Sequence, residues 1–302
     1  MYRVSSSNAA LGLLLPHLFL IACGGTPRGP VAGEEAGRKY PIVLNRDEEP
    51  GKAYHVRLEE ESTKTLVARL QERIVKEENE TETFTFVGTR KKLSAGKRQP
   101  TEYVVEALTR TSGSQKEALL PAGTTIRATH SAGAWHYTVD GQPLPEDIHA
   151  ILSSLMGGKT SDDEKGTDDA IFGSKEPRAV GERWSVNVAE LPVEEEFELD
   201  PEGASGSTRV AALRNVDGTE CLEIEAELSF PKVRFKALSA DAKVHSSAMS
   251  ARFLGLYPTD TRLPSLSTGM SFELVVSMDV ATPQGPVRMD MTAQTAQTTN
   301  RD

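Results

Sequence analysis

The sequence holds few side chains whose spacing points to chemistry. It has two cysteines, Cys23 and Cys221, and its six histidines are scattered, with no spacing typical of metal ligands. No G-x-S-x-G, H-E-x-x-H, C-x-x-C or G-x-G-x-x-G motif occurs in it. We therefore predict no catalytic, metal-binding or cofactor-binding residues, and Cys23 is the one residue to which we assign a modification.

Cys23 stands out because of the residues in front of it. An apolar run covers residues 9–21, which fits the core of a signal peptide and is shorter than the ~20 residues of a membrane-spanning helix. Arg3 supplies the positive charge that precedes such a core, and the small residue Ala22 closes the run just before the cysteine. The pattern predicts that the chain is exported and cut at this point.

Leu20-Ile21-Ala22-Cys23 resembles the lipobox of bacterial lipoproteins. In that family the cysteine thiol takes a diacylglyceryl group, the signal peptide is removed, and the new amine receives an acyl chain such as palmitate. The resemblance implies that residues 1–22 are lost and that Cys23 anchors the mature chain by its lipid, because two or more acyl chains hold a protein stably. The alternative is an ordinary signal peptide in which Cys23 has no role.

Gly24 bears on which membrane holds the anchor. Enterobacterial lipoproteins that stay in the inner membrane have an aspartate after the lipidated cysteine. The glycine at this position therefore implies the outer membrane, with the protein facing the periplasm.

The composition limits the partners of the chain. The formal net charge is -10 and the isoelectric point is about 5.3, which argues against binding nucleic acid or anionic lipid head groups by charge. If Cys23 is lipidated, Cys221 has no cysteine partner, so no intramolecular disulfide can form. The fold must then be stabilised by its hydrophobic core alone.

The chain after Cys23 begins with a tether and a first β-rich half. Residues 23–38 are rich in glycine and proline, which is typical of a flexible tether, and residues 39–158 form the N-terminal half. Residues 64–78 fit a strand or a helix, and their neighbours favour a strand. The three acids at 59–61 are interpreted as a solvated edge. Alternating or β-branched residues predict the other strands, at residues 40–44, 53–60, 81–90 and 102–111.

Residues 125–140 carry the clearest local signal in this half. An even-length turn around Ala132-Gly133 pairs Ile126 with Val139, Ala128 with Tyr137, and His130 with Trp135. These six residues share one face, which we expect to pack inward. His130 is therefore assigned a structural role beside the Trp135 ring.

A short helix follows this hairpin. Pro145 opens it, acids occupy its first turn, and Gly157-Gly158 ends it. One face carries an apolar stripe, which predicts packing against the core: Ile148, Ile151, Leu152, Leu155 and Met156.

Residues 159–176 begin with a polar, acidic run and are predicted to be a loop that joins the two halves. The acids also suggest a calcium site, but the D-x-D-x-D-G spacing of a calcium loop is missing. No metal is therefore assigned to this segment.

The segment Val180-Gly181-Glu182-Arg183-Trp184 starts the second half with a turn that leads into a strand. Over residues 127–188 the sequence resembles a group of β-rich secreted bacterial lipoproteins that have a V-G-E-x-W turn at this place. The resemblance rests on short motifs, implies a fold type and carries no activity.

Residues 177–297 form the C-terminal β-rich half, and residues 298–302 are predicted to be a disordered tail. Asp217-Gly218 is a preferred two-residue turn within residues 207–228. The expected register pairs Leu213 with Leu222 and Ala211 with Ile224, and it places Cys221, interpreted as a small filler residue, opposite Arg214. Alternating residues predict three further strands, at 244–256, 270–280 and 287–294.

We therefore predict a mainly β fold: antiparallel strands forming a curved sheet, sandwich or half-barrel with one short helix. The predicted function is that of a lipid-anchored cell-envelope lipoprotein, a non-enzymatic binding or scaffolding module in the periplasm. The alternative is a carrier of a lipid or other hydrophobic ligand in a half-barrel cavity, and a hydrolase with a non-local active site ranks third. The expected partners are the membrane, through Cys23, and a protein or hydrophobic ligand, without any cofactor.

Overall fold

The computed structural model describes residues 37–96, 98–156, 166–191, 197–236, 238–239 and 241–301. The predicted signal peptide, Cys23 and almost all of the predicted tether lie outside these residues. No helix within the described ranges is long and apolar enough to span a membrane.

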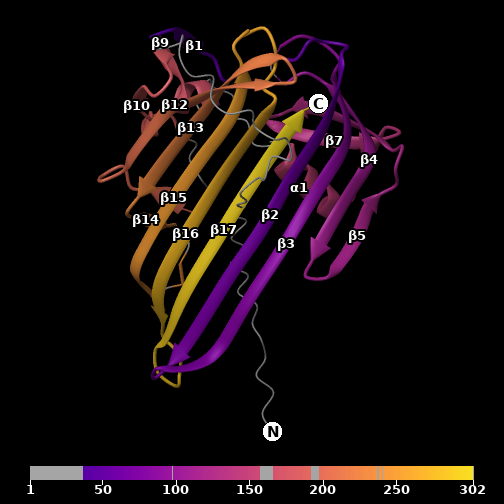
Figure 1. Ribbon diagram of the computed structural model, residues 1–302. Helices are drawn as coiled ribbons and strands as arrows, with labels where there is room; N and C mark the ends of the chain where they lie inside the picture. The colour runs from indigo at the N-terminus through magenta and orange to yellow at the C-terminus, as the bar shows by residue number, and fades with distance from the viewer. Residues whose placement is uncertain are drawn as a thin grey trace.

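One antiparallel sheet of 13 strands dominates the structure (Figure 1). It is open and curved, which confirms the predicted fold class. β5 (Gln115–Leu120) pairs with β4 beside the main path. Across the sheet the order is β10 (Arg183–Ser185), β12 (Ser205–Val216), β13 (Thr219–Phe230), β15 (Ala242–Pro258), β16 (Ser267–Val280), β17 (Val287–Arg301), β2 (Ala53–Leu70), β3 (Arg73–Lys92), β4 (Thr101–Ser112), β6 (Thr125–Ser131), β7 (Ala134–Val139) and β8 (Gln142–Pro143).

Smaller elements surround the sheet. β1 (Lys39–Ile42) pairs with β9 (Ser174–Ala179), and β11 (Phe197–Leu199) pairs with β14 (Val233–Phe235). The helices are α1 (Glu146–Leu155), α2 (Asp168–Phe172) and the 3-10 turn η1 (Val188–Glu190). The predicted short helix is thus confirmed as α1.

Local turn chemistry explains the hairpins. Asp217 and Gly218 both have positive φ, at 49° and 85°, which is the geometry of the two-residue turn that matches the twist of paired strands. The hairpin of β6 and β7 has the predicted register, with His130 opposite Trp135. Gln71 and Glu72 form a similar turn at φ of 49° and 64° without any glycine. Residues 64–78 are therefore parts of two strands and their turn, and the helical alternative is wrong.

A β-bulge corrects one predicted pair. Leu213 lies opposite Leu222 as expected, but Ile224 pairs with Val210 and not with Ala211. Ala211 is the extra residue of the bulge, which shifts the register between Val210 and Ala212. The sequence pattern alone does not reveal such an insertion.

Two predicted boundaries also differ from the structure. The predicted tail at residues 298–302 is wrong as far as Arg301, because β17 continues through this residue. The predicted loop at 159–176 contains α2 and the start of β9; residues 159–165 lie outside the described chain. Thr167 caps α2 by accepting a hydrogen bond from the Ala170 N–H at 3.3 Å.

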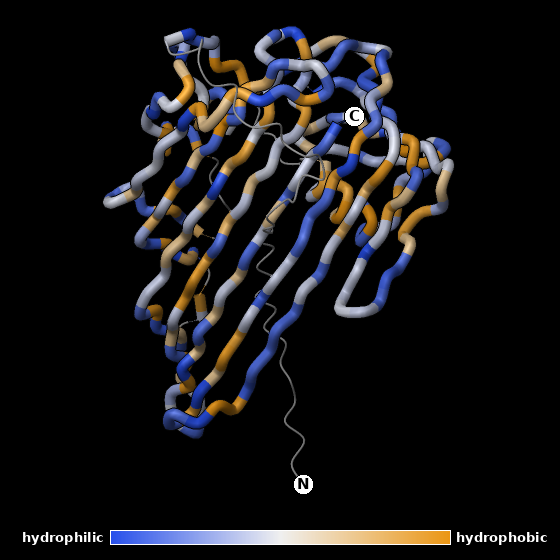
Figure 2. Tube along the Cα trace, viewed as in Figure 1, coloured by the Kyte–Doolittle hydropathy of each residue, from blue (hydrophilic) through white to orange (hydrophobic). Residues whose placement is uncertain are grey.

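The core lies on one face of the sheet, which we call the inner face. Hydrophobic and hydrophilic residues alternate along the long strands (Figure 2), so one face collects the apolar side chains. In the first half, α1 covers this face behind β2 and β3 (Figure 1), with Leu152 and Leu155 buried against strand residues such as Leu58 and Phe86. A second hydrophobic cluster lies mainly in the second half. It includes Leu274 of β16 and also Leu66, which β2 contributes from the first half.

Candidate functional site

A methionine-rich surface occupies the inner face of β15, β16 and β17. Five of the seven methionines of the chain lie there, and Met278 lies directly opposite Met289 in the β16–β17 ladder. Cross-strand pairing places these residues on the same face as Leu274 and Val276. We call this surface the Met-rich face and define it as Met249, Met270, Phe272, Met278, Met289 and Met291.

The Met-rich face is apolar and graded in exposure. Met249, Met278 and Met291 are buried, whereas Met270, Phe272 and Met289 are partly exposed. Methionine has an unbranched, polarizable side chain that adapts its shape to irregular contacts. Such a surface can repack around an apolar ligand more easily than one built from branched side chains.

α2 and β14 contact β15, the strand at the border of the Met-rich face. Phe172 of α2 stacks on Phe253 of β15, with ring centroids 4.8 Å apart and planes 12° apart. β14 packs against β15. Among the described elements, β16 makes its extensive contacts with β15 and β17, and β17 makes its extensive contacts with β16 and β2.

The line where β17 lies beside β2, which we call the seam, joins the two halves of the chain. The two strands are close along their length, yet the backbone ladder between them contains one registered pair, Arg301 with Val56. Neighbouring ladders such as β16–β17 are paired throughout. Polar side chains therefore supply much of the specific bonding across the seam, in three clusters.

The first cluster lies at the end of the seam where β2 begins. Glu48, in the segment between β1 and β2, has a side chain only 2% exposed. Its Oε1 accepts from Arg301 Nε at 3.2 Å and lies 3.3 Å from Arg90 Nη1. Arg301 Nη1 also donates to Ser265 Oγ at 2.6 Å. Burial lowers the pKa of Arg301 below its usual value, and the charge of Glu48 opposes this effect.

Arg46 fastens the same connecting segment to the second half. Its Nη1 donates to the carbonyl of Pro258 at 2.7 Å, and its guanidinium lies 5.3 Å from the Tyr257 ring centroid. Asp169 of α2 accepts from the backbone N–H of Leu44 at 2.6 Å and of Asn45 at 2.9 Å. The segment before β2 is thus tied to the second half and to α2, which lies between the two halves.

The second cluster lies midway along the seam, on the inner face. Ser154 of α1 donates to Glu60 Oε2 at 2.6 Å, and Gln297 Nε2 donates to the Ser154 carbonyl at 2.5 Å. Glu60 is only 4% exposed. Burial raises the pKa of its carboxyl above the ordinary value, while the hydrogen bond from Ser154 opposes this.

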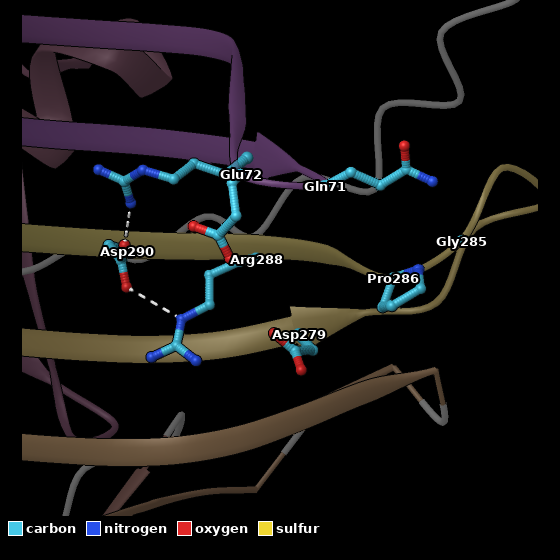
Figure 3. A pocket seen from close by; sticks show the side chains of 8 residues that line it. Gln71, Glu72, Asp279, Gly285, Pro286, Arg288 and Asp290 are labelled. Atoms are coloured by element: carbon cyan, nitrogen blue, oxygen red, sulfur yellow. Dashed lines mark hydrogen bonds and ion pairs between the residues drawn. The ribbon is translucent and has the colours of Figure 1, made fainter.

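The third cluster lies on the outer face at the far end of the seam, in a pocket of about 490 Å³ (Figure 3). Arg69 of β2 forms an ion pair with Asp290 of β17, and Arg288 lies 3.6 Å from the same carboxylate. Ser277 donates to Asp290 at 2.6 Å, and this hydrogen bond is the main cause that lowers the pKa of Asp290. The pocket has both signs of charge, so it does not select an ion of one sign.

A second cavity, of about 670 Å³, lies beside β1 and α2. Its lining includes the charged residues Asp169, Lys175 and Glu190. No group of three or more His, Cys, Asp or Glu side chains within the described ranges is arranged to hold a metal ion.

The structure places the residues singled out from the sequence as follows. Cys23, the predicted lipidation site, lies outside the described residues. Cys221 is fully buried opposite Arg214, and burial raises the pKa of its thiol to about 11. His130 packs edge-on against Trp135, with ring centroids 5.3 Å apart.

Sequence reasoning missed Glu48, Glu60 and Arg301. Glu60 was interpreted as part of a solvated edge, yet the alternation of Val56 and Leu58 puts it on the apolar face, so the signal was present. Glu48 lies in a polar stretch that carries no such signal. Arg301 lies in the predicted tail, where its binding to a residue near the start of the fold could not be seen.

No family model and no curated protein matches this chain. Among solved structures, one on lipid–protein interactions in lipovitellin aligns with a TM-score of 0.33 and 9% identity over 85% of this chain and 25% of that chain. Pseudomonas aeruginosa OpdQ aligns with a TM-score of 0.23 and 8% identity over 83% and 97%. A mutant porin of Rh. blastica gives 0.17 and 8% over 82% and 100%. This chain thus spans 25% of the lipovitellin chain, and similarities this low assign neither a family nor a function.

Proposed function

We propose that this chain is a lipid-anchored, non-enzymatic binding protein of the bacterial cell envelope. The lipid on Cys23 would anchor the chain in the outer membrane, and the folded part would face the periplasm. The lipobox-like sequence that ends at Cys23 and the glycine after it support this proposal. The open, curved sheet supports a role in binding.

The ligand we propose is a lipid or another molecule with a long apolar chain, held on the Met-rich face. The observation that carries this proposal is the concentration of five of seven methionines on one face of three adjacent strands. A core that only needs to be filled is better specified by branched side chains with defined rotamers. Methionine instead provides a surface that many apolar shapes can fit.

The partly exposed side chains of the Met-rich face indicate the manner of binding. The two cavities described above are lined largely by polar and charged residues, so neither is a preformed apolar cavity. A ligand on the Met-rich face would first meet the side chains of Met270, Phe272 and Met289, which are partly exposed, and would displace them. The affinity would be modest, because this repacking opposes binding.

A titration with a fluorescent fatty acid tests the proposal. We expect saturable binding to the wild-type chain and at least a tenfold weaker affinity for Phe272→Asp. The matched control is Val275→Asp on the same strand, since Val275 is 45% exposed on the outer face. Equal affinities of the two variants, or no binding to the folded wild type, would overturn the apolar-ligand proposal.

A further inference from the structure

The lower stretch of β3, residues 73–81, has a strand on one side only. β2 pairs with it continuously, but β4 begins to pair with β3 at Glu82, opposite Ser112. Within the described chain no strand pairs with the other side of residues 73–81. Figure 1 shows this part of β3 extending beyond the ends of β4 and β5.

This free edge is accessible. Each residue of the stretch is exposed except Glu78, which is half-buried, and Ile74 and Val75 are 57% and 56% exposed. Every second residue of an edge strand directs its backbone N–H and C=O away from the sheet. The edge therefore offers an unused row of donors and acceptors to a further strand.

The charge along the edge is uneven. Residues 77–81 of the edge contain three glutamates and no basic residue, whereas Arg73 and Lys76 lie at the turn end of the edge. Glu78 pairs with Lys76 at 2.7 Å and Glu82 with Arg110 at 2.5 Å. Within the described residues, Glu77 and Glu80 have no ion pair. Residues 77–81 thus keep a negative excess, and Figure 2 shows the edge as largely hydrophilic.

We infer that this free edge binds a basic, extended polypeptide, which joins the sheet beside β3 as an added strand. Main-chain hydrogen bonds would provide affinity, and opposite-charge pairs across the strands would provide selectivity. A second copy in parallel register fits poorly, because it brings the acidic segments of two edges together, whereas an antiparallel copy could place Lys76 opposite Glu78 and is the competing outcome of the test. This surface is separate from the Met-rich face, so the inference does not rest on the proposed lipid binding.

The register of β3 defines the partner's pattern. Glu78, Glu80 and Glu82 lie on the inner face, because they pair with Leu66, Lys64 and Ser62 of β2. Glu77, Asn79 and Thr81 lie on the outer face. The partner strand should therefore carry lysine or arginine opposite Glu78 and Glu80, facing the inner side, and neutral residues between them and beside Lys76.

The test uses the full chain and a fluorescein-labelled ten-residue peptide that alternates lysine with threonine and valine. We expect saturable binding that weakens at least tenfold when sodium chloride is raised from 50 to 500 mM, because exposed charges are screened. Hydrogen exchange should slow at residues 73–81 in the complex. The same peptide with alternate backbone nitrogens methylated should not bind, because it cannot complete the ladder.

Charge reversal gives the matched variants. Glu78→Lys with Glu80→Lys should weaken binding at least tenfold and should gain binding to the corresponding glutamate peptide. Glu146→Lys with Glu202→Lys makes the same charge change at exposed sites elsewhere and should bind as the wild type does. Equal binding of the methylated peptide, protection outside residues 73–81, or a dimer paired through β3 would overturn the inference.

Discussion

Arg301, in the last strand, donates to Glu48, which precedes the first long strand, at 3.2 Å. Arg90 of β3 contacts the same carboxylate at 3.3 Å, so one buried acid holds residues from both halves of the sheet. The bond lies next to Arg301–Val56, the one registered backbone pair between β17 and β2. We therefore regard this cluster as the fastening of the seam.

Removal of Glu48 tests this view. Glu48→Ala leaves two arginines close together with side chains only 14% and 23% exposed. Breaking a buried pair in this way costs about 3–5 kcal/mol. We expect urea unfolding to show a loss of this size in the free energy of unfolding.

The neighbouring acid Asp47 is the matched control. Its side chain is 73% exposed and lies 3.3 Å from Lys92. Exposed ion pairs contribute about 0–1 kcal/mol, so Asp47→Ala should change stability by less than about 1 kcal/mol. Equal effects of the two substitutions would show that Glu48 does not fasten the seam.

Glu60 gives a prediction about pH. Burial raises the pKa of its carboxyl above 4.5 in the folded chain, so the folded state binds this proton more tightly than the unfolded state does. Glu60 therefore opposes folding increasingly as the pH rises from 4.5 through the folded pKa. Glu60→Gln should be more stable than the wild type at pH 7 and equally stable at pH 4, as measured by urea unfolding.

An exposed acid separates this effect from general charge removal. Glu117 of β5 is exposed, and Glu117→Gln should leave stability within about 0.5 kcal/mol of the wild type at both pH values. If Glu60→Gln were less stable than the wild type at pH 7, the proposed cost of ionising Glu60 would be refuted.

Asp290 should show the opposite pH dependence. Its pKa is lowered, mainly by the hydrogen bond from Ser277, so its contribution is present above pH 3.8 and is lost as the pH falls through the folded pKa. Because the side chain is 40% exposed, we expect Asp290→Asn to cost only about 1 kcal/mol at pH 7. The difference should shrink as the pH falls below 3.8; a constant difference in unfolding free energy would point to a change in packing.

Cys221 should be chemically inert while the chain is folded. The side chain is fully buried, and burial raises the pKa of the thiol to about 11. Only the thiolate reacts readily, so iodoacetamide at pH 7.5 should modify the folded protein at least a hundredfold more slowly than the protein in urea. Rapid modification of the native protein would contradict the role of Cys221 as a buried filler residue.

Local patterns in the sequence were sufficient for the hairpins. Ala132-Gly133 and Asp217-Gly218 fix short turns, and the alternation on each side then sets the register to within one bulge. The helix was equally readable, since the apolar stripe that includes Leu152 agrees with its position under the sheet. In each case the decisive interactions lie within a few residues of one another.

The contacts between distant segments could not be read in this way. β17 lies beside β2, and Arg301 bonds to a residue 253 positions away. Neither strand carries a pattern that selects the other, because alternation defines a face and not a neighbour. The seam, its three polar clusters and the free edge of β3 all depend on that strand order.

The lipid on Cys23 is the central claim, because it determines where every other surface of the molecule operates. Intact-mass spectrometry of the protein extracted from its own bacterial membrane tests it most directly. We predict a chain that begins at Cys23 and carries the added mass of a diacylglyceryl group and an amide-linked acyl chain. A mature chain with an unmodified cysteine, or one cut at another residue, would contradict the account.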